Sequence, residues 1–441
     1  MRPTLSWSEL PGRTVGILGL GNEGAASLRA CRARGIEPIL VDDEPAGKAP
    51  GEHVLATADG GLDALLGCEV VIKTPGYPRY CPQIATLLDG GVHIVGGLGL
   101  WLADADRTRV ACVTGTKGKS TTTAIAGHLI NRLGHRCLVG GNIGVLPFDP
   151  AVGDAYDYWI IEVSSYQAVE VPVTPPVVAV TSLHPDHLPW HRGDVSVYYR
   201  DKLSLCTHPG ADLTIANGDS ALLRNRRDLL GPRVQWVHAD DEPDAIWPEN
   251  LQVLGTHNRH NALIARAVLQ GLGVPEANDP AALAAAAEGF TGLASRLQVI
   301  GHVDGVTFVD DSLSTNVLPT LAAVEAFPDR RVALIVGGTD RGIDYRTLGE
   351  GLRSRVTPLR VLTIPDNGPH IRAVLEATDP GPAVGADDTA DLGAAVRAGY
   401  AWARPDGVVL LSPAAASFGR FRDYRERGVV FATAMESCVE Q

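Results

Sequence analysis

The segment TGTKGKSTTT, at residues 114–123, contains the residue types that bind a nucleoside triphosphate. In a glycine-rich turn between a strand and a helix, backbone amides can surround phosphate oxygens, a lysine can reach the transferred phosphoryl group, and a hydroxyl can ligate Mg²⁺. The turn departs from the G-x-x-x-x-G-K-[ST] pattern, because Val113 stands at the position of its first glycine. The other contacts do not depend on that glycine, so we expect ATP to bind here. The expected ATP-binding residues of the turn are Gly115, Thr116, Lys117, Gly118, Lys119, Ser120 and Thr121.

Three further side chains suited to this chemistry follow: Glu162 in EVSSYQ, His187 in HPDHLPWH and Lys202 in RDKLSL. A carboxylate and an imidazole at strand ends suit a second Mg²⁺, which needs few protein ligands when a substrate phosphate supplies the rest. Taken singly, each residue has an ordinary alternative, as a solvated strand-end acid, a polar-loop histidine or a surface cation. Their order and spacing behind the phosphate-binding turn favour the functional interpretation.

A second glycine-rich turn, GLGNEG at residues 19–24, follows a predicted strand and precedes a predicted helix. It matches G-x-G-x-x-G through Gly19, Gly21 and Gly24, and the acidic Asp42 lies about twenty residues further on. Such glycines let backbone amides approach a diphosphate at a helix N-terminus, which suits any nucleotide diphosphate. The turn alone leaves the nucleotide undecided, and a purely structural tight turn is the alternative.

The elements that position these turns alternate regularly along the chain. Short runs rich in Val, Ile and Leu recur between helix-length segments rich in Ala, Leu and Arg, which predicts parallel sheets joined by crossover helices. The chain is therefore expected to be α/β throughout. The runs expected to be strands lie at 13–21, 37–43, 69–76, 109–116, 158–165, 177–183, 331–338, 359–365 and 407–413.

Length sets the number of domains. A chain of 441 residues suggests about three domains of roughly 150 residues each. A polar stretch at 103–108 and the end of an Ala-rich helix at 280–290 mark two breaks. The expected domains are 1–106, 107–293 and 294–441.

Charge and cysteine usage exclude several classes of protein. The formal net charge of −13 argues against a general binder of nucleic acid or of anionic membranes, because phosphate contacts need a cationic face. Seven scattered cysteines without C-x-x-C spacing suggest neither a disulfide framework nor a zinc site. The N-terminus lacks a signal-peptide pattern and no uncharged stretch approaches ~18 apolar residues, so a cytoplasmic protein is expected.

Ten ordered strings give the chain a resemblance to the Mur ligase family along essentially its whole length, most closely to the MurD type. They are TGTKGKSTTT, GGNIG, EVSSYQ, DHLPWH, DKL, HNRHN, SRLQ, DDSLSTN, GGTDRG and LSPAAASFGRF. The resemblance implies an N-terminal Rossmann-like domain for the UDP end of the substrate, a central P-loop ATPase with a mostly parallel sheet, and a C-terminal Rossmann-like domain. It thereby favours UDP as the ligand of GLGNEG.

The resemblance also implies roles for individual residues. The expected catalytic residues are Lys119, His187 and Lys202, of which Lys202 matches a lysine that the family carbamylates. The expected metal ligands are Ser120, Glu162 and His187. Contacts to adenine, ribose and phosphate are expected at Asn258, Asn261, Arg296 and Asp311. Contacts to the UDP-sugar are expected at Gly19, Gly21, Gly24, Asp42, Thr74, Gly76 and Asn142. Contacts to glutamate are expected at Leu313, Thr315, Arg341, Ser417 and Tyr424.

The reaction implied by this resemblance is the ATP-dependent addition of glutamate to UDP-N-acetylmuramoyl-L-alanine in peptidoglycan synthesis. The substrate carboxylate attacks the γ-phosphate to form an acyl phosphate, and the incoming amine then displaces phosphate through a tetrahedral intermediate. Positioning, together with charge neutralisation by Mg²⁺ and Lys119, is expected to supply most of the rate enhancement.

The chain departs from the usual MurD pattern near the expected glutamate pocket. DSKATN becomes DSLSTN, so Leu313 replaces a lysine. Loss of an ammonium group beside a carboxylate removes a charge-assisted hydrogen bond worth roughly 1.5 to 3 kcal/mol. Neutral drift with compensation by Arg341 is one interpretation. The other departures are Lys117, Pro189, Ser295 and Gln298, where Asn, Asp, His and Glu are usual.

A sharper interpretation is a resemblance to the variant MurD group that adds L-glutamate, which shares TGTKGKSTTT, DKLSL, RLQ and a DS-[IL]-ST string. Members of that group work with a separate epimerase that inverts the terminal glutamate after ligation. L-glutamate addition is our main hypothesis, and D-glutamate addition is the alternative.

Other classes of protein fit the motifs less well. A folylpolyglutamate synthase would not need GLGNEG, and an NAD-dependent dehydrogenase would not need the phosphate loop. A non-catalytic nucleotide-binding scaffold would not need the intact set Lys119, Ser120, Glu162 and His187.

Overall fold

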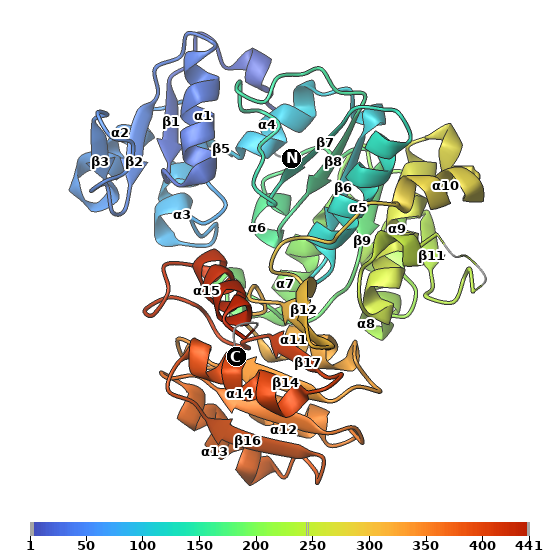
Figure 1. Ribbon diagram of the computed structural model, residues 1–441. Helices are drawn as coiled ribbons and strands as arrows, with labels where there is room; N and C mark the ends of the chain where they lie inside the picture. The colour runs from blue at the N-terminus through green and yellow to red at the C-terminus, as the bar shows by residue number, and fades with distance from the viewer. Residues whose placement is uncertain (1–3, 244, 246, 439–441) are drawn as a thin grey trace. The chain divides into compact units, whose positions relative to one another are not determined.

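Three separate β-sheets with flanking helices form the framework of the chain (Figure 1). The structure, a computed structural model, describes residues 4–243, 245 and 247–438. The outermost residues of the expected first and third domains, 1–3 and 439–441, lie outside the described residues. Nearly all strand pairs are parallel, which confirms the predicted α/β class.

The chain divides into two compact units. The first comprises Met1–Asn250 and His260–Glu288 and contains the first two sheets. The second comprises Leu251–Arg259 and Gly289–Gln441 and contains the third sheet. The domain boundaries expected after residues 106 and 293 stay predictions.

The first sheet has five parallel strands in the order β3-β2-β1-β4-β5. The chain leaves β1 toward β2 and β3 and then returns to β4 on the other side of β1. In such sheets ligands bind beyond the carboxyl ends of the strands at this point of reversal. The strands are β1 (Val15–Leu18), β2 (Ile39–Asp42), β3 (Val54–Ala56), β4 (Val70–Lys73) and β5 (His93–Val95), and the helices are α1 (Asn22–Arg32), α2 (Leu62–Leu66), α3 (Pro82–Asp89) and α4 (Gly97–Asp104).

The second sheet has six parallel strands in the order β11-β10-β9-β6-β8-β7. Its central strand β6 is fully buried, as expected for the apolar run that precedes the phosphate loop. The strands are β6 (Val110–Thr114), β7 (Cys137–Gly141), β8 (Tyr158–Glu162), β9 (Val177–Val180), β10 (Leu213–Asn217) and β11 (Val234–Val237). The helices are α5 (Lys119–Arg132), α6 (Ser165–Ala168), α7 (Val195–Leu203), α8 (Ala221–Arg224), α9 (Thr256–Gly271) and α10 (Pro280–Ala287).

A continuous apolar core explains why the first two sheets belong to one unit. It includes side chains of the first sheet, such as Ile17, and of the second, such as Cys112 and Ile161. The rings of Trp7 and Phe148 meet within it at 5.6 Å between centroids. Burial of this apolar surface holds the two sheets together.

The third sheet has six strands in the order β12-β13-β17-β14-β15-β16, and only the β12–β13 pair among these described strands is antiparallel. Neighbouring residues Leu334 and Ile335 of β14 belong to different apolar clusters, so helices cover both faces. The strands are β12 (Gln298–Val303), β13 (Val306–Asp310), β14 (Val332–Val336), β15 (Leu359–Thr363), β16 (Val384–Asp388) and β17 (Val408–Leu411). The helices are α11 (Val317–Glu325), α12 (Arg346–Leu352), α13 (Gly368–Thr378), α14 (Leu392–Ala403) and α15 (Tyr424–Glu436).

Helix N-termini follow two patterns. Asp279, Asp391 and Asp423 cap α10, α14 and α15, and each carboxylate accepts a backbone N–H of the first turn. Helix α5 instead begins after Gly118, whose φ is +87°. A glycine at this position places no side chain in front of the helix, and the helix dipole favours an anion there. Within the described part of the chain, no helix is both long and apolar enough to span a membrane.

Candidate active site

The phosphate loop between β6 and α5 needs glycine at two positions. Gly115 has φ +137°, and a Cβ there would lie 2.2 Å from the Thr181 Oγ1 and 2.9 Å from the Ser182 amide nitrogen. At Gly118 a Cβ would lie 2.6 Å from the Asn261 Oδ1. Both glycines therefore permit a close approach of the loop to neighbouring chain segments, which any larger residue would prevent.

The end of β9 fixes the shape of this loop. The Thr116 amide donates to the Ser182 carbonyl at 2.9 Å, and the Lys117 amide donates to the Ser182 Oγ at 2.8 Å. The Thr116 hydroxyl lies 2.9 Å from the Tyr198 hydroxyl and 3.0 Å from the His184 carbonyl. Contacts to Ser182, His184 and Tyr198 thus fix the conformation of the loop, so it is preorganised for a ligand.

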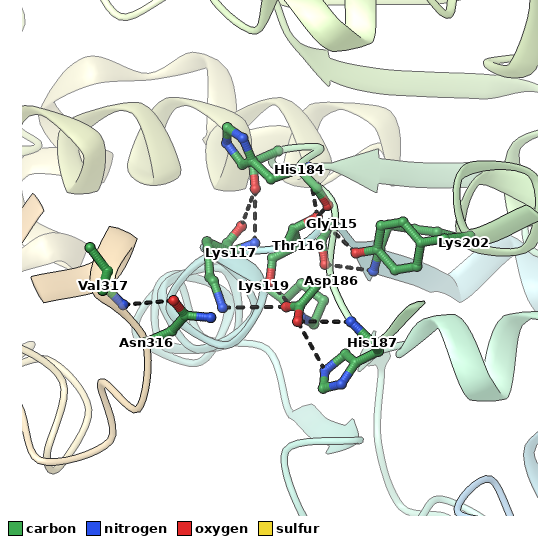
Figure 2. Close-up of polar contacts among 12 residues, drawn as sticks. Gly115, Thr116, Lys117, Lys119, His184, Asp186, His187, Lys202, Asn316 and Val317 are labelled. Carbon is green, nitrogen blue, oxygen red and sulfur yellow. Dashed lines mark hydrogen bonds and ion pairs between the residues drawn. The ribbon is translucent and has the colours of Figure 1, made fainter. Parts of the chain in front are cut away.

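Two ammonium groups lie at the loop itself. Lys119 is the first residue of α5, and its Nζ donates to the Thr116 carbonyl at 3.2 Å, so the side chain folds back over the loop. Lys117 is more exposed, and its Nζ lies 3.4 Å from the Asp186 Oδ2. Figure 2 shows the contact between Lys117 and Asp186, with Lys119 and His187 nearby. Ser120 follows Lys119 and is 5% exposed.

Glu162 ends β8 and is 2% exposed. Its Oε1 accepts a hydrogen bond from the Asn142 side-chain amide at 2.8 Å, whereas its Oε2 is buried and has no hydrogen-bond partner among the residues that the structure describes. A buried carboxylate oxygen without a partner is costly unless a cation or a proton satisfies it. The chemistry of this atom therefore suits a divalent metal ion.

His187 lies in the turn before a short helical segment, with φ +51°. Its backbone amide donates to the Asp186 Oδ1 at 3.0 Å, and its ring packs against the Tyr166 ring. Partial burial lowers the pKa of His187, and the ammonium groups of Lys117 and Lys202 lower it further, against the opposing effect of Asp186. The imidazole is therefore neutral near pH 7 and can donate a lone pair to a metal ion.

Lys202, on α7, is 2% exposed, and its Nζ donates to the Gly115 carbonyl at 2.9 Å. Burial lowers the pKa of this amine well below its usual range, and the nearby ammonium of Lys119 lowers it further. The structure thus brings Lys202 to the back of the phosphate loop, although the two are 87 residues apart in the sequence. A buried amine with a depressed pKa is a nucleophile.

The described residues contain no group of three or more His, Cys, Asp or Glu side chains that could enclose a metal ion. Mg²⁺ is commonly held by one or two protein ligands together with substrate phosphates. The arrangement of Glu162, His187 and the phosphate loop fits this mode of binding.

A cleft of about 450 Å³ lies at the reversal point of the first sheet, within the first unit. Six residues expected to contact the UDP-sugar line it: Gly19, Gly21, Asp42, Thr74, Gly76 and Asn142. Gly24 serves packing, because a Cβ there would lie 2.1 Å from the Gly19 carbonyl oxygen. Asp42 holds the turn in shape, since its carboxylate accepts the amides of Leu20 and Glu44.

Other residues of this cleft were not predicted from the sequence, among them Glu23, Lys48, Ser164 and Tyr166. Glu23 lies in the first turn of α1, and its Oε1 accepts a hydrogen bond from the Gln167 Nε2 at 2.5 Å. The Gln167 Oε1 in turn accepts hydrogen bonds from the backbone amide and the hydroxyl of Ser164. Burial raises the pKa of Glu23 to about 7.

Comparisons with known proteins identify the family to which the chain belongs. The profile of the Mur ligase middle domain matches residues 113–252, and that of the Mur ligase, glutamate ligase domain, matches residues 295–415. The chain is 40% identical to a UDP-N-acetylmuramoyl-L-alanine--L-glutamate ligase from Micromonospora sp., over 97% of both chains. The chain belongs to the Mur ligase family. A ligase of the same name from Salinispora tropica is 38% identical over 97% of this chain and 98% of its own.

The fold agrees with a solved Mur ligase. The chain is similar to the crystal structure of MurF ligase from Thermotoga maritima in complex with ADP, with a TM-score of 0.56 and 14% identity. The match covers 99% of this chain and 98% of the MurF chain. At that identity the likeness concerns the fold alone. It agrees with the three-domain Mur ligase architecture that the sequence resemblance implied.

Three of the four residues expected to contact adenine, ribose and phosphate of ATP in this Mur ligase are buried: Asn258, Asn261 and Asp311. Asn261 lies beside Gly118 in the first unit. Asn258 is on the same helix, and its Nδ2 donates to the Leu254 carbonyl at 2.7 Å. In the second unit, Asp311 is 6% exposed and accepts hydrogen bonds from the Leu297 amide and the Ser412 hydroxyl. Arg296, the fourth expected residue, is half-buried in the same unit.

The residues expected to contact glutamate lie in loops of the second unit and on α15. Leu313 and Thr315 follow β13, Arg341 follows β14, and Ser417 follows β17. Ser417 is 5% exposed, whereas Arg341 is exposed, and its guanidinium carbon lies 5.3 Å from the centroid of the Phe418 ring. Tyr424 begins α15, and its carbonyl accepts a hydrogen bond from the Ser312 hydroxyl.

Proposed function

We propose that this chain is an ATP-dependent ligase that adds L-glutamate to UDP-N-acetylmuramoyl-L-alanine in peptidoglycan synthesis. The observation that carries the proposal is the identity of 37 to 40% with relatives of that name over nearly the full length of the chain. The geometry around the phosphate loop supports it, because a buried acid, a neutral imidazole and three lysines lie around the loop. We retain the domains 1–106, 107–293 and 294–441 as the proposed UDP-binding, ATPase and C-terminal domains.

The phosphate loop is the proposed ATP site. The proposed contacts are Gly115, Thr116, Lys117, Gly118, Lys119, Ser120 and Thr121 for the phosphates, and Asn258, Asn261, Arg296 and Asp311 for the rest of the nucleotide. Lys119 folds over the loop, which supports a role in neutralising the charge of the transferred phosphoryl group. The tight fixing of the loop to β9 supports a positioning role, since a misplacement of about 1 Å costs roughly a hundredfold in rate.

Ser120, Glu162 and His187 are the proposed Mg²⁺ ligands. The unpartnered Oε2 of Glu162 supports this assignment. When bound, Mg²⁺ would supply Lewis acidity and neutralise negative charge on the phosphates. Asn142 positions Glu162 through a 2.8 Å hydrogen bond.

We further propose that Lys202 is carbamylated. Its neutral amine can attack the carbon of CO₂, form a nitrogen–carbon bond and release a proton, which leaves a negatively charged carbamate. Burial and the low pKa of the amine support the first step. The adjacent ammonium of Lys119 would stabilise the charge of the product. A carbon-13 NMR signal for a carbamate in bicarbonate-labelled enzyme, absent in Lys202→Arg, is the expected result, and its absence from the wild type would refute this step.

The cleft at the first sheet is the proposed site for the UDP-sugar. Gly19, Gly21 and Gly24 shape the turn, Asp42 holds it, and Thr74, Gly76 and Asn142 line the remaining wall. Asn142 also bonds to Glu162. It therefore links the proposed sugar cleft to the proposed metal ligand, which supports the delivery of the substrate carboxylate to the γ-phosphate.

Two bond exchanges complete the proposed reaction. The substrate carboxylate oxygen bonds to the γ-phosphorus, the bond from that phosphorus to the bridging oxygen breaks, and ADP leaves. The glutamate nitrogen then bonds to the acyl carbon and loses a proton, while the carbon–oxygen bond to phosphate breaks. Lys119 and the loop amides hold the phosphoryl group throughout, so the protein acts mainly by positioning and charge neutralisation.

In the second unit, Leu313, Thr315, Arg341, Ser417 and Tyr424 remain the proposed contacts to glutamate. If the ligated residue is L-glutamate, a pathway in which the peptide carries D-glutamate needs a later inversion at that carbon. We therefore propose a separate epimerase as the enzyme that consumes the product.

Product formation with each glutamate enantiomer tests the proposal. Purified enzyme is incubated with ATP, Mg²⁺, UDP-N-acetylmuramoyl-L-alanine and either L- or D-glutamate, and the product is identified by mass and chiral analysis. We expect ADP release that depends on both co-substrates, and a product that contains L-glutamate. A product with D-glutamate alone would select the usual MurD reaction, and turnover with folate would select a folylpolyglutamate synthase.

A further inference from the structure

His191 is a buried histidine whose two ring nitrogens both have hydrogen-bond partners. It ends the short helical segment Leu188–His191 and is fully buried. Its Nδ1 lies 2.7 Å from the Asp201 Oδ2, and its Nε2 lies 3.1 Å from the Ser165 Oγ. A carboxylate can only accept, so Nδ1 carries the proton and donates it, and Nε2 of the neutral imidazole accepts from the hydroxyl. The two bonds therefore fix both the tautomer and the orientation of the ring.

Serine, histidine and aspartate connected in this way resemble the side chains of a hydrolytic triad, but burial excludes that chemistry here. A nucleophilic hydroxyl must reach its substrate. Ser165 is 3% exposed and His191 is fully buried. The arrangement is therefore suited to holding segments of the chain together.

Asp201 connects His191 to Lys202, because Asp201 and Lys202 are consecutive residues of α7. Its other carboxylate oxygen, Oδ1, accepts a hydrogen bond from the Tyr80 hydroxyl at 2.7 Å. Burial and the neighbouring carboxylate raise the pKa of Tyr80 to about 12, so this hydroxyl stays protonated near neutral pH and keeps donating. Both oxygens of Asp201 are thus fixed, and with them the position at which α7 presents Lys202.

The backbone between His187 and His191 is held in a conformation that these residue types rarely adopt. His187 has φ +51° and Arg192 has φ +61°, so the left-handed region is occupied on both sides of Leu188–His191. Such conformations cost free energy and persist only where surrounding contacts hold them. The Trp190 amide donates to the His187 carbonyl at 3.1 Å, and the next residue, His191, is anchored through its ring. Without that anchor, His187 would relax and its imidazole would point in a different direction.

The His191 ring also packs against a residue that supports the phosphate loop. The centroids of the His191 and Tyr198 rings are 5.1 Å apart, and the rings meet edge to face at 74°. The Tyr198 hydroxyl lies 2.9 Å from the Thr116 Oγ1. His191 therefore contacts the supports of three parts of the proposed site: His187, Lys202 and the loop itself.

We propose that His191 is a positioning residue of the proposed ligase reaction, which fixes the His187 and Lys202 segments relative to each other. The inference rests on the proposed ligase function, and it concerns a residue too deeply buried to touch a substrate. His191 acts on His187 through the backbone and on Lys202 through Asp201. Loss of the ring nitrogens should therefore misdirect both groups while the UDP-sugar cleft keeps its shape.

Kinetics and Mn²⁺ binding of full-length His191→Phe and His191→Asn test the proposal. Phenylalanine fills the space of the ring without either hydrogen bond. The amide nitrogen of asparagine, like Nδ1 of histidine, is two bonds from Cβ and can still donate to Asp201. This variant therefore separates the Asp201 bond from the bulk of the ring.

We expect kcat to fall about 10- to 100-fold in His191→Phe, since loss of a group that orients a metal ligand has effects of this size. The dissociation constant for Mn²⁺, measured by electron paramagnetic resonance with ADP present, should rise about 10-fold. KM for L-glutamate should stay within about twofold of wild type, because only local positioning changes. His191→Asn should recover most of both losses.

His135→Phe is the matched control. The His135 Nε2 lies 3.3 Å from the Glu276 Oε2, and its ring meets the Tyr158 ring edge to face at 5.5 Å, so this histidine also pairs with a carboxylate and packs on a tyrosine. It follows the C-terminal end of α5, about 20 Å from the phosphate loop at the other end of that helix. His135→Phe should leave kcat and Mn²⁺ binding unchanged.

Ser165→Ala gives a second measurement if His191→Phe does not fold. It removes only the hydroxyl that bonds Nε2, and kcat should fall about 2- to 10-fold, the range that a neutral hydrogen bond implies.

Three results overturn the proposal. They are wild-type kcat and Mn²⁺ affinity in folded His191→Phe or wild-type kcat in Ser165→Ala, losses in His191→Asn as large as in His191→Phe, and an equal loss in His135→Phe. Failure of the ligase function itself is distinguishable, because wild-type enzyme would then form no glutamate-containing product.

Discussion

Replacement of Gly115 by alanine tests whether the phosphate loop works by close packing against Thr181 and Ser182, which follow β9. The added Cβ would lie 2.2 Å from the Thr181 Oγ1 and 2.9 and 3.0 Å from the amide nitrogens of Ser182 and Thr181. Backbone nitrogens cannot rotate away as a flexible side chain can, so the loop itself must shift. Overpacking of this kind costs about 1 to 3 kcal/mol, and an alanine at φ +137° adds strain of about 1 to 3 kcal/mol.

The shift should affect catalysis as well as folding. Gly115 also presents its carbonyl to Lys202 at 2.9 Å, so a displaced loop changes two parts of the proposed site together. We expect Gly115→Ala to lower the free energy of unfolding by about 2 to 6 kcal/mol in urea titration. We expect kcat/KM for ATP to fall about 100-fold or more, as for a misplacement of about 1 Å.

Gly134→Ala is the matched control for the backbone strain. Gly134 follows α5 with φ +96°, and a Cβ there meets nothing within 4 Å. It should lower the unfolding free energy by about 1 to 2 kcal/mol through strain alone and leave kcat/KM for ATP unchanged. Wild-type kcat/KM for ATP in Gly115→Ala would refute the packing argument, and an equal kinetic loss in both variants would attribute the effect to general instability.

Three further predictions concern single side chains. Lys119→Ala should abolish ligation and leave UDP-sugar binding largely intact by calorimetry; equal loss of both would contradict the separation of the two sites. Burial raises the pKa of Glu23 from 4.5 to about 7, so the unfolded chain loses this proton first as pH rises. The stability contributed by Glu23 is therefore full below about pH 4.5 and is lost by about pH 7. As pH rises across this window, the melting temperature of Glu23→Gln should fall less than that of wild type. Parallel curves of melting temperature against pH would show that Glu23 does not titrate there. Leu313→Lys should shift the ratio of L- to D-glutamate incorporation, and an unchanged ratio would show that this position does not set stereochemistry.

Local patterns were enough to predict the phosphate loop and the α/β class. The turn at residues 114–123 joins a strand to a helix, and its two required glycines can be recognised from the sequence because the neighbouring residues define the motif. Strands such as β6, β8 and β14 were also expected, since a buried parallel strand is apolar throughout. These features depend on residues close together in the chain.

Several strands were missed because their composition is less apolar or their runs are short. Strand β16 contains two aspartates and has no fully buried residue. The sequence does contain a signal for the antiparallel pair β12–β13, because Asp304 and Gly305 form an Asp-Gly pair, which is preferred in two-residue hairpin turns. In the structure both residues have the positive φ that such a turn needs.

The walls of the cleft at the first sheet were harder to predict. Glu23, Lys48 and Tyr166 meet only because the first two sheets pack together, and no spacing in the sequence encodes that contact. Asp42 was singled out by its distance from GLGNEG as a contact to the UDP-sugar, which stays a prediction, and the structure adds that its carboxylate accepts a hydrogen bond from the Leu20 amide.

The glutamine of EVSSYQ shows that a motif residue can serve a purpose its neighbours do not share. Gln167 uses its carbonyl oxygen within its own helix turn and its NH₂ group across to Glu23, so both halves of the amide have a partner. A glutamate at this position would set two carboxylates against each other, and one of them would have to remain protonated. The motif thus requires an amide at this position for the contact between α6 and α1. This requirement is separate from the role of Glu162, the acidic first residue of the motif.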